Sequence, residues 1–315
     1  MKIFKFLSEN LLLIITLFLL AFIPLYPKLP IVTIQHTWVY IRAEDFLVAC
    51  TLTLLLFLVL FKKVKLKTPL TFSMLLFWII GAVSTFHGVL ILFPTLSNVF
   101  PNVAFLSLIR RMEYMSLFFI AYLSLKNRKS IYYVIASLST ILILIVGYGL
   151  GQKLLGFPAY LTGNEEFAKG IPLQISSLAR VPSTFAGNYD LAAYLVLVIP
   201  IFVSLIFGFK NTLVKIGLFI TSALGFGLLF LTVSRISFFV LMLSLVILLV
   251  LQKKRLSIIS LFVLTFLFLI FSPGLMNRFG KTVSTVNVLV DANTGAALGQ
   301  IRSTPKEYFK DKIIL

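Results

Sequence analysis

The sequence is poor in charge and in cysteine. Only 12% of the 315 residues are Asp, Glu, Lys or Arg, whereas a soluble domain is about a quarter charged. A water-soluble fold needs more polar side chains than this to cover its surface, which excludes a soluble globular enzyme. The single cysteine, Cys50, lies in an apolar stretch. The chain therefore has no internal disulfide framework and no thiolate metal site.

Acidic residues are scarcer than basic ones. The chain has 28 Lys and Arg against 10 Asp and Glu, a formal net charge of +18. In a soluble protein this excess would indicate nucleic-acid binding.

The sequence also lacks Walker and Rossmann patterns. The glycine-rich stretch Gly147–Gln152 is not such a motif, because it ends an apolar helix and follows no predicted strand. The two histidines, His36 and His87, are not spaced as metal ligands. We therefore expect neither a metal nor a cofactor.

Apolar residues are what the sequence has in excess. They make up 60% of the chain, and the mean hydropathy is +1.07. They gather in runs close to the length of about 20 residues that crosses a bilayer as a helix. The nine runs are 7–25, 45–61, 70–86, 103–125, 131–150, 190–209, 216–233, 236–251 and 256–271. They predict an all-α transmembrane bundle over residues 1–271, with an external loop at 151–189 and the start of a large external loop at 272–315.

The connections between these runs alternate in charge. One set comprises the N-terminus and residues 62–67, 126–130, 210–215 and 252–255. It holds 14 basic residues and one acidic residue, while the rest of the chain holds 14 basic and nine acidic residues. With nine spans, every basic connection falls on one side of the membrane. The positive-inside bias places that side and the N-terminus in the cytoplasm, and the C-terminus outside. The net charge is therefore a topology signal, and no nucleic-acid partner is expected.

Two arginines stand at the predicted outer boundary. Arg180 opens a segment of small and turn-forming residues that leads into an apolar run, whose helix Asn188 can cap. Arg235 follows Ser234 in the tight turn between two other runs. The ordinary interpretation of Arg180 is an arginine in a surface loop. The ordinary interpretation of Arg235 is an arginine whose side chain reaches the membrane interface. Two guanidinium groups on one face would also form a planar, permanently charged clamp for a diphosphate.

Other charges lie inside the runs or at their ends. Arg110 and Arg111 fall in the outer part of the fourth run, where Arg110 and Glu113 are three residues apart and can pair on one helix face. A structural pair is one interpretation, and a share in substrate binding is the other. Glu44 and Asp45 stand at the start of the second run, where acids stabilise a helix N-terminus. A general-base role is the alternative for these two carboxylates.

These residues resemble the motifs of the O-antigen ligase and O-antigen polymerase family. The segment Arg180–Leu195 is similar to a family stretch that reads R-x-x-G-T-F and continues with spaced Asn, Ala and Leu, except that Ser183 replaces the glycine. The segment Leu231–Arg235 resembles the family's L-T-x-S-R element. Two further segments, Arg42–Phe46 and Ile109–Tyr114, are similar to weaker features of the family.

The resemblance implies a metal-independent membrane glycosyltransferase of the GT-C type, acting at the outer face of the cytoplasmic membrane. Its donor would be a glycan on undecaprenyl diphosphate, and its acceptor would be lipid A–core or another lipid-linked repeat. Arg180 and Arg235 match the arginines that hold the diphosphate. Further substrate contacts are expected from four polar residues: Arg110, Arg111, Asn188 and Ser234.

Family members continue with an external loop that bears a histidine and with further helices. This sequence ends at Leu315 with no histidine after His87. The resemblance therefore predicts a truncated chain that lacks its general base, unless His36 or His87 substitutes. A transporter or flippase of a lipid-linked or anionic solute is the alternative function, and it should show charges near mid-membrane or paired broken helices. A non-catalytic membrane scaffold is a third hypothesis, which leaves two arginines on one face unexplained.

Overall fold

The computed structural model of the chain describes residues 2–37, 39–92, 100–163, 166–176 and 179–270. Within these ranges, a helix lies over each of the nine apolar runs. The helices are α1 (Lys2–Leu25), α2 (Ala43–Leu60), α3 (Thr71–His87), α4 (Pro101–Ser124), α5 (Arg128–Leu154), α6 (Asn188–Gly208), α7 (Thr212–Thr232), α8 (Arg235–Leu251) and α9 (Arg255–Ile270). The part of the external loop predicted at 272–315 lies outside the described residues.

Short elements complete the fold. A π-helical turn, Gly88–Leu92, extends α3, and a 3-10 turn covers Phe167–Lys169. Strands β1 (Pro30–Val32) and β2 (Ile41–Arg42) form an antiparallel two-stranded sheet with an irregular register. This small hairpin is the one departure from the predicted all-α fold among the named elements.

Five of the helices are long and apolar enough to cross a membrane: α2, α3 with its π-helical extension, α5, α6 and α7. Helices α8 and α9 are apolar but shorter. Helix α4 has sufficient length, but Arg110, Arg111 and Glu113 make it more polar. Large apolar side chains such as Phe72 and Ile236 are exposed on the outer surface, as expected for helices that face lipid. The chain is therefore a helical membrane protein, whose nine spans stay a prediction.

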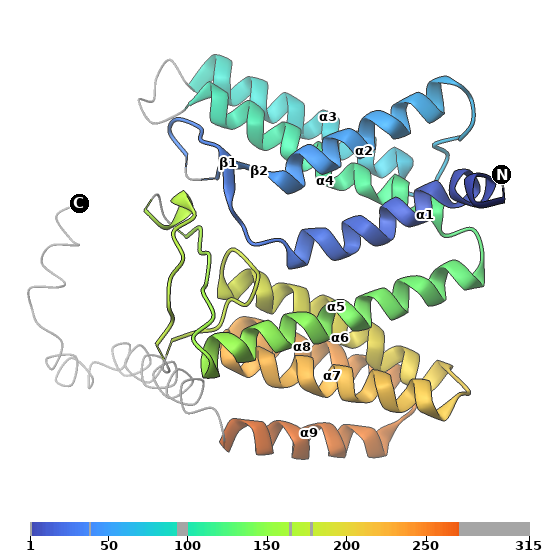
Figure 1. The fold of residues 1–315 in the computed structure, drawn as a ribbon, viewed down its shortest axis with the longest axis vertical. Coiled ribbons are helices and arrows are strands. Elements are labelled where there is room, and N and C mark those ends of the chain that lie inside the picture. Colours follow the sequence, from blue (N-terminus) through green and yellow to red (C-terminus); the bar gives the residue numbers. More distant parts are fainter. Residues whose placement is uncertain (1, 38, 93–99, 164–165, 177–178, 271–315) are drawn as a thin grey trace, which may run out of the picture.

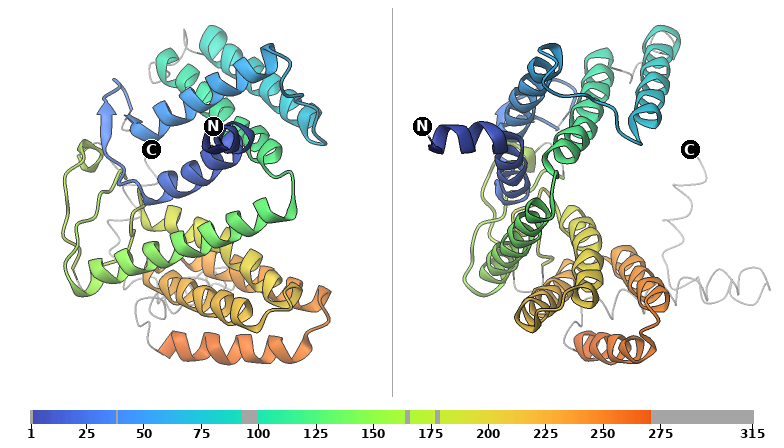
Figure 2. Two further views of the ribbon diagram at one scale, coloured as in Figure 1. Left: turned by 45° about the vertical axis from the view of Figure 1, so that its right-hand side comes forward. Right: turned by 90° about the vertical axis from the view of Figure 1, so that its right-hand side faces the viewer.

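The helices form two groups that meet along α1 and α5. Figure 1 shows α1–α4 in the upper part and α5–α9 in the lower part, and Figure 2 shows the same division along the helix axes. The main buried core lies among α5, α6, α7 and α8. Gly225 permits the close approach of α7, because a Cβ there would lie 3.1 Å from Leu142 of α5 and 3.4 Å from Ile199 of α6.

Successive helices run in opposite directions, so the connections fall into two sets (Figure 1). The N-terminus and the turns that follow α2, α4, α6 and α8 lie at one end, which we call the basic end because these segments carry the predicted basic connections. The β1–β2 hairpin and the described residues of 155–187 lie at the opposite end, which we call the loop end. The loop end thus includes the described part of the external loop predicted at 151–189.

Candidate functional site

The segment that begins at Arg180 lies against the turn between α7 and α8. The N–H of Val181 donates to the carbonyl of Leu231 at 3.1 Å, and Nδ2 of Asn188 donates to the carbonyl of Thr232 at 3.0 Å. Both carbonyls belong to the last turn of α7, where a helix leaves its acceptors without intrahelical partners. The two arginine-bearing motifs of the sequence are therefore neighbours at the loop end.

The role of Asn188 differs from the predicted helix cap. Gly187 is the N-cap of α6, and Asn188 is the first residue of the helix. Its side-chain amide instead donates to the carbonyl of Thr232, which lies in the last turn of α7. The prediction found the right residue near the site but assigned it the wrong contact.

The turn before Arg235 is tightly held. Val233 adopts the left-handed conformation, with φ 55°, which a β-branched residue tolerates only when its neighbours enforce it. Ser234 is buried and its Oγ donates to Oγ of Ser237 at 2.9 Å, while its N–H donates to Oγ1 of Thr232 at 3.4 Å. Arg235 therefore starts α8 from a defined position, and its side chain is half-buried.

Gln152 fixes the Arg180 segment from the side of α5. Its side chain, 1% exposed, accepts from the N–H of Ser183 at 2.9 Å and donates to the carbonyls of Ser183 at 2.9 Å and Pro158 at 3.0 Å. Sequence reasoning missed this residue, although a glutamine in the last turn of an apolar helix was the available signal.

The backbone at Ser183 adopts a conformation that favours glycine. Its φ is 52°, in the left-handed region that favours glycine. The serine is buried, and its Oγ donates to the carbonyl of Ile145 at 2.7 Å. The next residue, Thr184, donates through Oγ1 to the carbonyl of Pro24 in α1 at 2.5 Å. The segment is thus attached to both helix groups.

Arg180 itself is half-buried and contacts an aromatic residue. Its Nη1 donates to the hydroxyl of Tyr189 at 3.1 Å, and its guanidinium carbon lies 5.8 Å from the centroid of the same ring. Tyr189 is an exposed residue in the first turn of α6. Because a guanidinium carries five N–H donors, the contact leaves donors for a ligand.

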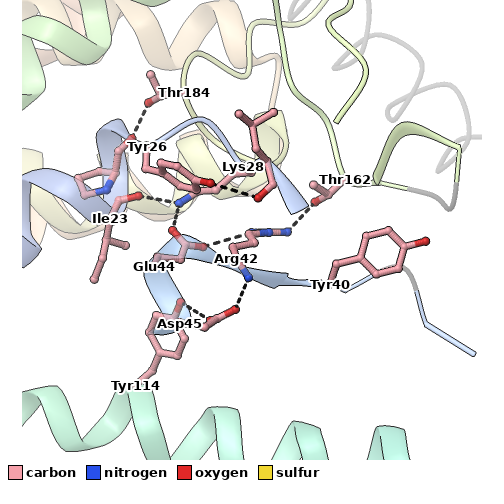
Figure 3. A network of polar contacts seen from close by, with 12 residues as sticks. Ile23, Tyr26, Lys28, Tyr40, Arg42, Glu44, Asp45, Tyr114, Thr162 and Thr184 are labelled. Atoms are coloured by element: carbon pink, nitrogen blue, oxygen red, sulfur yellow. Dashed lines mark hydrogen bonds and ion pairs between the residues drawn. The ribbon is translucent and has the colours of Figure 1, made fainter. Parts of the chain in front are cut away.

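A second polar cluster joins α1, α2 and the loop end (Figure 3). The buried ammonium of Lys28 forms an ion pair with Glu44 and donates to the carbonyl of Ile23 at 2.6 Å. Arg42 places Nη1 3.3 Å from Oε1 of Glu44 and Nη2 3.3 Å from Oγ1 of Thr162. Burial lowers the pKa of Lys28 below 10.5, and the Glu44 carboxylate opposes this shift. The cluster thus holds the end of α1 and the start of α2 against residues 155–187.

Asp45 is the centre of the same cluster on the side of α4 (Figure 3). Its carboxylate accepts from the backbone N–H of Arg42 at 2.9 Å, from Nη2 of Arg110 at 2.8 Å and from the hydroxyl of Tyr114 at 3.0 Å. Arg110 therefore pairs with Asp45 rather than with Glu113, because α2 and α4 pack together and bring the two charges into contact. The structural interpretation of Arg110 is supported, with a different partner.

The remaining predicted residues lie in the α1–α4 group. Arg111 is exposed and lines a cavity of 390 Å³ between α3 and α4, away from the contacts of Arg110. The ring of His36 stacks on Phe100 with centroids 4.0 Å apart, and His87 is the last residue of α3. Within the described ranges, no group of three or more His, Cys, Asp and Glu side chains could hold a metal ion.

The predicted site residues therefore divide in two. Arg180, Asn188, Ser234 and Arg235 belong to contacting segments at the loop end, whereas Arg110 and Arg111 belong to the other helix group. Comparison of the chain with protein-family models, with curated proteins and with solved structures finds no match.

Proposed function

We propose that the protein is a membrane glycosyltransferase that transfers or polymerises a glycan carried on undecaprenyl diphosphate, as the resemblance to O-antigen ligases and polymerases suggests. The observation that carries the proposal is the contact between the Arg180 segment and the α7–α8 turn. Two hydrogen bonds, Val181 to Leu231 and Asn188 to Thr232, join the segments that present the two arginines.

The arrangement suits a diphosphate. Arg180 offers a guanidinium with donors to spare, and Arg235 stands at the first position of α8. A helix N-terminus carries a positive partial charge, and α6 and α8 both begin at the loop end of the molecule. In the proposed reaction an acceptor hydroxyl attacks the anomeric carbon, a general base takes its proton, and the bond from that carbon to the diphosphate oxygen breaks. The two arginines would stabilise the negative charge that develops on the leaving lipid diphosphate.

The proposed orientation follows from the charges at the two ends. All five predicted basic segments lie at the basic end (Figure 1). The positive-inside bias places this end in the cytoplasm and the loop end outside, with nine spans, the N-terminus inside and the C-terminus outside. The donor and the acceptor would then meet at the outer face of the cytoplasmic membrane.

The proposal is tested by glycan transfer in membranes that contain the protein, with a labelled glycan on undecaprenyl diphosphate and a lipid-linked or lipid A–core acceptor. Arg180→Ala and Arg235→Ala should each reduce transfer by more than about tenfold at equal membrane levels, a loss of about 1.4 kcal/mol in transition-state stabilisation. Arg→Lys should restore only part of it, because an ammonium cannot make a planar bidentate contact. Lys169→Ala, which removes an exposed cation from the same connection, is the matched control.

Full activity in either alanine variant would remove that arginine from the mechanism. If the wild-type protein moved the labelled donor across the membrane without cleaving it, the transporter alternative would replace the proposal.

A further inference from the structure

An apolar groove opens between α6, α7, α8 and α9 near the basic end. It has a volume of 710 Å³, and apart from three serines and an alanine its lining is Leu, Ile, Val and Phe from the four helices. Two of the serine hydroxyls are occupied, because Ser222 donates to the carbonyl of Leu218 at 2.7 Å and Ser260 to that of Ser257 at 2.9 Å. The groove therefore suits a hydrocarbon chain and offers little to a polar ligand.

The depth of the groove matches one leaflet of a bilayer. Along α9 its lining runs from Leu256, directly after the basic turn, to Leu267. Eleven residues at 1.5 Å each correspond to about 16 Å. The hydrocarbon core of a bilayer is about 30 Å thick, so one leaflet contributes about 15 Å. An acyl chain of the leaflet at the basic end would extend along the groove with its head group at the α8–α9 turn.

The mouth of the groove is positively charged. The ammonium of Lys254 lies 5.7 Å from the ring centroid of Phe207, a lining residue, and the N–H of Lys254 donates to the carbonyl of Leu249, another lining residue, at 2.9 Å. Lys253 and Arg255 flank it.

These cations have no acidic neighbours on their own helices. Residues 191–270 contain no Asp or Glu. The three ion pairs that the described residues form all lie in the α1–α4 group, and none includes a cation of the α8–α9 turn. An anion from outside the chain would therefore neutralise positive charge at the α8–α9 turn.

We propose that the groove binds an anionic phospholipid of the leaflet at the basic end, with one acyl chain between the four helices and the phosphate beside Lys253, Lys254 and Arg255. A zwitterionic lipid could fill the same groove but would bring no net charge to the three cations. Each basic residue near a lipid surface strengthens the binding of an anionic head group by about fivefold. The lipid would support α9, whose main helix contacts are with α8 and α7, and this role is independent of the proposed glycan transfer.

The test places a tryptophan in the groove of the full chain. With Trp38 and Trp78 replaced by Phe, F219W reports on the groove and I79W on the lipid-facing surface of α3. Phe219 and Ile79 are 58% and 60% exposed. They lie about 10 and 12 Å along their helices from the basic end, at 1.5 Å per residue. The two positions are therefore matched in exposure and depth.

The reporter variants are placed in phosphatidylcholine vesicles with increasing fractions of phosphatidylglycerol whose brominated acyl chains quench tryptophan. Half of the quenching of F219W should occur at a mole fraction at least about fivefold below that for I79W. Neutralising the α8–α9 turn, K253Q/K254Q/R255Q, should abolish the difference. The same loss of charge in the connection after α2, K62Q/K63Q/K65Q, should preserve it.

Three results would overturn the proposal. Equal dependence on mole fraction at the two reporters would show an ordinary lipid-facing surface. Equal quenching of F219W by brominated phosphatidylcholine and phosphatidylglycerol would show a groove that does not select an anionic head group. No quenching of F219W by either lipid would show that protein covers the groove, from the same chain or from a second copy.

Discussion

Removing the charge of Glu44 should destabilise the polar cluster that joins α1, α2 and the loop end. Glu44 is 5% exposed and accepts from both Lys28 and Arg42. Glu44→Gln preserves the shape of the side chain and one acceptor oxygen but removes the negative charge. Lys28, which is 6% exposed, would then stand beside the carbonyl of Ile23 and a neutral amide.

Two limits define the size of the effect. Removing one member of a buried ion pair costs about 3–5 kcal/mol in the free energy of unfolding. Lys28 can instead release its proton on folding, which for an ordinary pKa of 10.5 costs about 5 kcal/mol at pH 7, at about 1.4 kcal/mol per pH unit. Asp45 stays in the cluster and still favours the charged lysine. We therefore expect a loss of about 3 kcal/mol at pH 7.

The loss should depend on pH in a defined direction. Burial already lowers the pKa of Lys28 in the folded protein, and losing the Glu44 charge should lower it further. Between this lowered pKa and 10.5, the unfolded chain holds a proton that the folded chain lacks. Stability then rises with pH in that window. The penalty of Glu44→Gln should accordingly shrink between pH 7 and pH 9, by at most about 1.4 kcal/mol per pH unit.

The assay is thermal unfolding of the detergent-purified protein at pH 7, 8 and 9, followed by the loss of monodisperse protein. Glu166→Gln, at an exposed position in residues 155–187, is the control and should leave the midpoint unchanged. The double variant K28M/E44Q removes the unpaired cation and should recover much of the loss. A penalty for E44Q that is equal at pH 7 and pH 9, or a double variant less stable than E44Q, would refute the electrostatic reasoning.

Three further predictions concern the loop end and the topology. Gln152→Leu should lower the free energy of unfolding by about 2–4 kcal/mol, measured by denaturation in detergent, because it leaves buried backbone groups of Ser183 unsatisfied; no loss would mean that another group replaces the glutamine. Ser183→Gly should change stability by less than about 1 kcal/mol in the same assay, because relief of the left-handed backbone offsets the lost hydroxyl bond; a loss above 2 kcal/mol would assign the larger role to the hydroxyl. Reporter fusions test the orientation, and one inverted result in mid-chain would contradict it. The fusions should read cytoplasmic at Lys65, Lys129 and Lys254 and external at Lys169 and Lys281.

The helix positions could be predicted from the sequence because each helix is an apolar run close to bilayer length. Their ends were less predictable, because local hydrogen bonds extend a helix beyond its apolar part. The fifth helix begins at Arg128 rather than 131, since the side chain of Asn127 accepts from the N–H of Ser130 at 3.0 Å and caps it. The β1–β2 hairpin has no such signal, because strands of two or three residues are too short for a pattern of alternation.

The contacts of the polar residues could not be predicted, because they depend on which helices pack together. Spacing along α4 favoured a pair between Arg110 and Glu113, but such a pair contributes only about 0.2–0.5 kcal/mol on an exposed helix. Asp45 competes successfully because the packing of α2 places its carboxylate within 2.8 Å of the guanidinium. In the same way, the side chain of Asn188 donates to the carbonyl of Thr232. No local sequence pattern indicates this contact.

The three described ion pairs bear on which arginine a phosphate would meet. Arg42 and Arg110 already contact carboxylates, and an incoming anion would have to displace Glu44 or Asp45, which are both buried. Breaking such a contact leaves the carboxylate without its partner, which is costly at low exposure. Arg180 differs, because its described hydrogen bond goes to the neutral hydroxyl of Tyr189. An anion can approach Arg180 without separating an ion pair. For the proposed diphosphate contact, the geometry therefore favours Arg180 over Arg42 and Arg110, whose ion pairs join elements of the α1–α4 group.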